Sequence, residues 1–85
     1  MDHRPQNIRR AILDKLESAE PYALPEDALQ VEVSASTRPP LAQAEFDDAL
    51  AFLQGQRLVA TLPDELDPTL TKWLITESGK TLLRK

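Results

Sequence analysis

The period of the apolar residues changes twice along this chain, and these changes constrain its fold more than any other feature. In the stretch LVATL at 58–62, Leu58, Ala60 and Leu62 occupy every second position. In TKWLI at 71–75, Trp73 and Ile75 continue the same alternation. A period of two is typical of a strand with one buried face. The acidic, turn-rich segment PDELDP separates the two stretches, so we predict an antiparallel hairpin.

The N-terminal part of the chain has a helical period instead. Ile8, Ile12 and Leu16 are each four residues apart and form one apolar stripe. Pro5 suits the first turn of a helix, where its missing N–H costs nothing. Pro21 cannot continue a helix. We therefore predict a helix that begins near Pro5 and ends just before Pro21.

Residues 25–35 fit two structures. Pro25 followed by Glu26 and Asp27 is typical of a helix start, because the acids complement the positive end of the helix dipole. The stretch LQVEV within this range alternates apolar and polar residues, which indicates a strand. We favour a short helix and keep the strand as the alternative.

The clearest helix lies in RPPLAQAEFDDALAFLQGQ. Its apolar residues fall on one side of a helix: Phe46, Ala49, Leu50 and Leu53. With Ala42 at the N-cap, Glu45 takes the N3 position of a capping box that lacks its Ser or Thr. We expect Gly55 to be the left-handed residue that closes this helix.

The last segment, WLITESGKTLLRK, contains Ser-Gly-Lys-Thr, which also ends a phosphate-binding P-loop. A P-loop needs a second glycine five residues before Gly79, and that position is Leu74, inside a predicted strand. We therefore interpret this segment as a final helix with Thr76 as its N-cap and Glu77 in its first turn. Leu82 and Leu83 are expected on its buried side.

The order of these elements resembles a winged helix-turn-helix domain of bacterial type. The resemblance depends on ALAFLQGQRLVATL and on WLITESGKTLL, which is similar to a Leu-Thr-x-x-Gly-x-x-x-Leu segment with Ile75, Thr76, Gly79 and Leu83 at its four defined positions. It implies a mainly α fold with a small antiparallel β-hairpin, about four helices and a two-stranded wing. We expect residues 1–85 to form a single domain.

The residue inventory argues against an enzyme. The chain has no cysteine and a single histidine, His3, at the mobile end of the sequence. No serine or threonine has a base nearby in sequence, so we predict no catalytic residue. We also predict no metal site and no cofactor. The N-terminus does not resemble a signal peptide and no apolar stretch approaches a membrane span, so we expect a cytoplasmic protein without membrane contact.

The charge distribution indicates what kind of partner the domain binds. Between Glu17 and Asp67 the sequence has eleven acids and only two bases, Arg38 and Arg57. On the predicted third helix the exposed positions carry no Lys or Arg, and they are Gln43, Asp47, Asp48, Ala51 and Gln54. Our first prediction is therefore a non-enzymatic binding module that uses this face for a protein partner or for self-association.

DNA binding by a transcription-regulator-like domain is the alternative, because winged helices commonly read the major groove with the third helix. Affinity for duplex DNA comes largely from neutralised phosphates, which an acidic helix opposes. The residues available for contact are Arg38, Gln43, Arg57 and Lys72. Basic residues also occur at both ends of the chain, and they would form a basic face only if the two ends meet in space. No small-molecule substrate is evident.

The missing capping hydroxyl gives a stability test. Ala42→Ser should raise the free energy of unfolding by about 0.5–1 kcal/mol, because a serine side chain would accept a bond from an N–H of the first turn. Thermal or urea unfolding measures the change. A lower melting temperature in this variant would show that the helix begins elsewhere.

Overall fold

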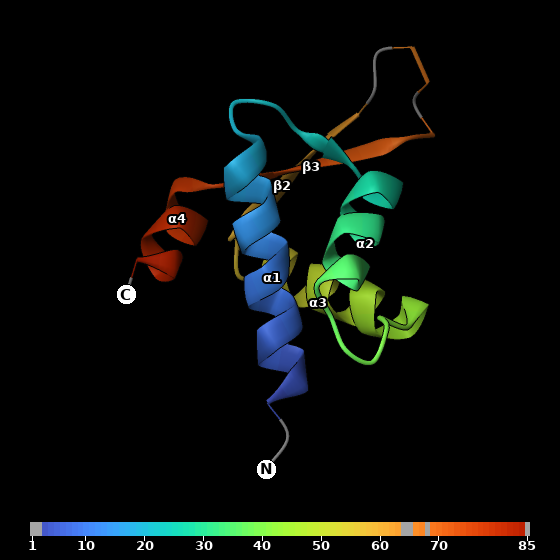
Figure 1. Ribbon diagram of the computed structural model, residues 1–85. Helices are drawn as coiled ribbons and strands as arrows, with labels where there is room; N and C mark the ends of the chain where they lie inside the picture. Colours follow the sequence, from blue (N-terminus) through green and yellow to red (C-terminus); the bar gives the residue numbers. More distant parts are fainter. Residues whose placement is uncertain (1–2, 64–65, 68, 85) are drawn as a thin grey trace.

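The computed structural model describes residues 3–63, 66–67 and 69–84, and apart from one short strand the elements follow the predicted order. They are α1 (Arg4–Ala19), β1 (Leu24–Pro25), α2 (Glu26–Ala35), α3 (Gln43–Gly55), β2 (Val59–Pro63), β3 (Thr71–Ile75) and α4 (Glu77–Leu83). The protein is thus mainly α with a small antiparallel sheet (Figure 1). Residues 25–35 are almost wholly helical, which confirms the favoured of the two structures.

The sheet has three strands in the order β1-β3-β2. The predicted hairpin is confirmed, with Val59 opposite Ile75 and Pro63 opposite Thr71. The two-residue strand β1 adds to the other edge of β3, with Leu24 opposite Trp73. It was not predicted, because two residues are too short to show an alternating pattern. The predicted PDELDP tip includes residues 64, 65 and 68, which lie outside the described residues.

The core lies between α1 and the elements on both sides of it. In Figure 1, α1 runs through the middle of the molecule, with α4 on one side and α2 and α3 on the other. The side chains that are buried most completely come from α1, α2 and α3, and they are Ile12, Leu13, Leu16, Leu29, Val33, Phe46 and Leu53. Trp73 and Ile75 on β3 join this cluster. No helix among the described residues is long and apolar enough to span a bilayer.

The end of α3 differs from the prediction. Gly55 is an ordinary helical residue, and the left-handed residue is Arg57, with a φ of 59°. The Leu58 N–H bonds to the Leu53 carbonyl at 3.0 Å, and the Arg57 N–H bonds to the Gln54 carbonyl at 3.0 Å. This pair of bonds is a Schellman motif, which requires the left-handed residue two positions after Gly55. The prediction placed the chain reversal at the only glycine nearby.

Helix α4 begins as predicted. The Thr76 hydroxyl accepts a bond from the Gly79 N–H at 3.2 Å and donates to the Arg57 carbonyl at 2.8 Å. The cap therefore also ties α4 to the end of α3. Leu83 packs against the core, but the prediction was wrong for Leu82, which is 42% exposed. With only seven residues, α4 turns one narrow face inward.

The two glycines give a matched pair of stability tests. A Cβ on Gly55 would meet nothing within 4 Å, so Gly55→Ala should raise the free energy of unfolding by about 0.5–1 kcal/mol through backbone entropy. A Cβ on Gly79 would collide with the Leu58 carbonyl oxygen and lie 2.7 Å from Ile75 Cγ1. Gly79→Ala should therefore lower the free energy of unfolding, by about 1–3 kcal/mol. Urea unfolding of both variants measures the two free energies. Equal changes in the two variants would contradict the packing around Gly79.

Candidate nucleic-acid interface

Helix α3 presents a polar side to solvent. All five residues predicted for its contact face are exposed: Gln43, Asp47, Asp48, Ala51 and Gln54. The opposite side of the helix is buried through Phe46, Leu50 and Leu53. Residues four apart lie on one side of a helix, and neighbours point about 100° apart. Gln43, Asp47 and Ala51 therefore share a stripe, whereas Asp48 is rotated about 100° from Asp47 and borders a small hollow with Arg9 of α1.

The third acid of α3 is engaged by α1. Arg4 Nε lies 2.5 Å from Glu45 Oε2, and Arg4 Nη2 donates to Glu45 Oε1 at 2.9 Å. Glu45 Oε1 also accepts a bond from the Ala42 N–H at 3.1 Å, which is the half capping box that the sequence predicts. The Arg4 hydrogen bond and then the Ala42 N–H lower the pKa of Glu45 from its ordinary 4.5 to about 2. Glu45 thus fixes the start of α3 against the start of α1.

Two glutamines and an aspartate form a chain of hydrogen bonds where α2 meets α3. Gln30 Nε2 donates to Gln43 Oε1 at 2.8 Å, and Gln43 Nε2 donates to Asp47 Oδ1 at 2.8 Å. Gln30 was not predicted as a site residue, because it lies within α2 and no sequence pattern links it to Gln43. The two bonds hold the Gln43 side chain across the junction of the two helices.

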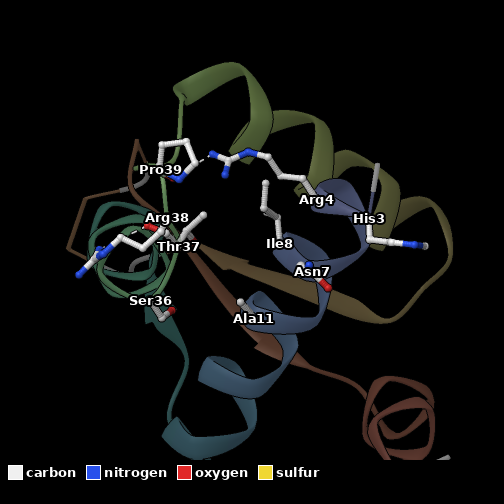
Figure 2. A pocket seen from close by; sticks show the side chains of 9 residues that line it. All are labelled: His3, Arg4, Asn7, Ile8, Ala11, Ser36, Thr37, Arg38 and Pro39. Carbon is white, nitrogen blue, oxygen red and sulfur yellow. Dashed lines mark hydrogen bonds between the residues drawn. The ribbon is translucent and has the colours of Figure 1, made fainter. Parts of the chain in front are cut away.

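A hollow of about 520 Å³ lies between the start of α1 and the loop before α3. Figure 2 shows Ile8, Ala11 and Thr37 around its inside, and Arg4 reaching toward Pro39, to whose carbonyl it donates at 3.0 Å. The side chains of His3 and Arg38 point away from the hollow (Figure 2). The hollow therefore does not gather cationic groups into an anion site.

The predicted basic contacts are spread over the molecule. Arg38 is exposed in the loop just before α3, where it donates to the Ala35 carbonyl at 3.3 Å. Arg57 follows the far end of α3, a helix of 13 residues and therefore about 20 Å long. Lys72 lies on β3 opposite Leu62 and Pro25. Arg38 precedes α3 and Gln43 is its first residue, whereas Arg57 and Lys72 lie at a distance from the start of α3.

The two basic ends of the chain do meet, but acids accompany them. Arg10 Nη2 donates to the Leu83 carbonyl at 3.4 Å, which places α1 beside α4. Terminal cations pair with carboxylates as follows: Arg4 with Glu45, Lys80 with Glu20 at 2.7 Å and with Glu77 at 3.2 Å, and Arg84 with Glu17 at 3.4 Å. Carboxylates at the end of α1 thus accompany the described cations of α4.

Two aromatic residues, Trp73 and Tyr22, differ in burial. Trp73 is buried at 6% exposure, and its Nε1–H donates to Glu26 Oε1 at 3.1 Å. This bond links the wing to the first turn of α2. Tyr22 is 75% exposed and lies near the end of β2, with Leu62 and Pro63. Among the described residues, no group of three or more His, Cys, Asp or Glu side chains could hold a metal ion.

The sequence matches no known family model and no curated protein. The fold, in contrast, is similar to solved transcription regulators. The PcaV transcriptional regulator from Streptomyces coelicolor superposes with a TM-score of 0.73 at 21% identity, over 89% of this chain and 48% of that one. The adhesin competence repressor AdcR from Streptococcus pyogenes gives 0.74 at 23%, over 92% and 50%.

A regulator of the MarR family from Silicibacter pomeroyi gives a TM-score of 0.72 at 19% identity, over 92% of this chain and 47% of that one. The chain thus spans about half the length of these three structures. Together with four helices and an antiparallel wing, the superpositions show that this chain has a winged-helix fold.

The Arg4–Glu45 contact predicts a specific acid dependence. Because the folded protein lowers the pKa of Glu45, the carboxylate stabilises the fold above pH 4.5, and this contribution is lost as the pH falls toward 2. Glu45→Gln should therefore be less stable than the parent at pH 7, and the difference should shrink between pH 4.5 and 2. Urea unfolding across this range measures it. A difference that stays constant with pH would contradict the contact.

Proposed function

We propose that this chain is a non-enzymatic DNA-binding domain of a transcription regulator similar to the MarR type, with α3 as the helix that enters the major groove. The observation that carries the proposal is the polar, solvent-facing side of α3 on a winged-helix frame. Helix α3 begins shortly after the exposed Arg38, and its exposed side carries Gln43 and Gln54. The superposed structures are transcription regulators, which supports DNA over the protein partner that we predicted first.

The Arg4 ion pair reduces the repulsion that one acid of α3, Glu45, would exert on DNA. Glu45 is held by the Arg4 guanidinium, and Asp47 accepts a bond from Gln43. Asp48 is exposed and lies about 100° around the helix from Asp47. Arg38 can contact a phosphate at the start of α3, and Arg57 and Lys72 can contribute further along the duplex. We therefore propose few phosphate contacts and a large share of binding from base edges.

A protein partner on the same face is the competing proposal. Asp47 and Asp48 are both exposed, and α3 carries no Lys or Arg. Such a face suits a basic partner or a second copy. The two proposals differ in one respect that can be measured directly, which is whether duplex DNA binds at low salt.

The test is selection of duplexes from a random-sequence pool, followed by titration of a labelled winner at 50 and 200 mM salt. With two or three phosphate contacts, affinity should fall about 10- to 40-fold between the two salts. Arg38→Ala should reduce the salt slope by about one. Arg84→Ala removes the same charge at the end of α4, beside Glu17, and should leave the slope unchanged.

No enrichment and no binding at 50 mM salt would remove the DNA proposal and leave the protein partner. If Arg38→Ala and Arg84→Ala reduced the salt slope equally, a uniform charge effect would explain both changes. That result would reject α3 and its preceding loop as the contact surface.

A further inference from the structure

The hydrogen bonds around Gln43 fix which way its amide faces. Gln43 is the first residue of α3, and the N-terminal residues of a recognition helix are those that reach base edges. The Asp47 carboxylate is one turn further along the same helix and can only accept hydrogen bonds. It therefore holds the Gln43 nitrogen at 2.8 Å and turns the Gln43 oxygen toward the Gln30 amide, which donates to it at 2.8 Å.

The bonds inside the protein leave half of the amide available. A primary amide has two N–H donors and an oxygen with two lone pairs. The bond to Asp47 uses one N–H, and the bond from Gln30 uses one lone pair. One N–H and one oxygen lone pair of Gln43 therefore remain, on neighbouring atoms of the amide.

This remaining pair matches one base. In the major groove, adenine presents an acceptor at N7 beside a donor at N6, so it takes an N–H and a carbonyl oxygen together. Guanine presents two acceptors, N7 and O6, and the Gln43 oxygen would face one of them. Thymine and cytosine each offer one polar group there, an acceptor or a donor.

We propose that Gln43 reads an adenine in the major groove, and that Gln30 and Asp47 are positioning residues that set the direction in which its amide faces. This inference rests on the proposed function. It assigns different roles to two neighbouring carboxylates. Asp47 orients the reading side chain, whereas Asp48 bonds to neither glutamine. An acid at position 47 therefore favours recognition of a base while it opposes contact with phosphates.

The experiment compares the four base pairs at each position of a selected duplex, using the full chain and five variants. The parent should prefer adenine at one position by about 5- to 150-fold, the range for a good bidentate contact. Gln43→Ala should abolish that preference and leave the other positions unchanged. Gln30→Ala and Asp47→Asn should each reduce it by at least about fivefold, because the amide can then turn over.

Asp48→Asn is the matched control, since it removes the same charge from the neighbouring residue. Asp47→Asn and Asp48→Asn should raise the overall affinity for DNA to a similar extent, but only Asp47→Asn should weaken the adenine preference. Asp47→Glu, the fifth variant, keeps a carboxylate, which can only accept, and should retain part of the adenine preference. Circular dichroism confirms that each variant is folded before binding is measured.

The outcomes separate the two levels of the proposal. If the parent selects no duplex, the proposed function fails and this inference fails with it. If it selects a duplex in which no base preference changes in Gln43→Ala, the DNA-binding proposal stands and the reading role of Gln43 is overturned. If Asp47→Asn and Asp48→Asn change the preference equally, the positioning role of Asp47 is overturned.

Discussion

The apolar stripe of α1 is the surface on which the rest of this protein packs. Ile8, Ile12 and Leu16 bury one side of the helix, and α2, α3, α4 and β3 all contact α1. A small domain buries only a modest fraction of its surface, and in this one the central helix contacts most of the other elements. The polar contacts then fix the orientation of α3, because Arg4 at the start of α1 holds Glu45 in the first turn of α3.

The features that sequence predicted are those with a local signal. Helical period, alternation and the Thr76 cap each involve neighbouring residues, and the structure reproduces them. The errors arose where a rule about neighbouring residues competed with hydrogen bonds or contacts between residues farther apart in the sequence. Gly55 was the natural residue for a left-handed position, but the Schellman motif places Arg57 there. The Arg4–Glu45 contact spans 41 residues, and the Gln30–Gln43 contact spans 13, so neither shows a periodic pattern that sequence could display.

The positions of the acids in α3 explain why the charge count alone favoured a protein partner over DNA. The acids of α3 were counted as equivalent charges that repel DNA. In the folded protein Glu45 is held by an arginine, Asp47 accepts a bond from a glutamine, and Asp48 borders a hollow beside α1. The net charge of the exposed side of α3 is unchanged, but the acidic side chains differ in their contacts. A helix of this kind would bind phosphates weakly and would depend on base contacts, which favours specificity over general affinity for DNA.

The central claim is that α3 is the surface that meets duplex DNA. Chemical-shift mapping of isotope-labelled protein, titrated with a selected duplex, tests it most directly. The account predicts that the largest shifts occur at Arg38, at Gln43 and along the exposed side of α3, with little change in α4. Shifts confined to α1 and α4, with α3 unchanged, would contradict it.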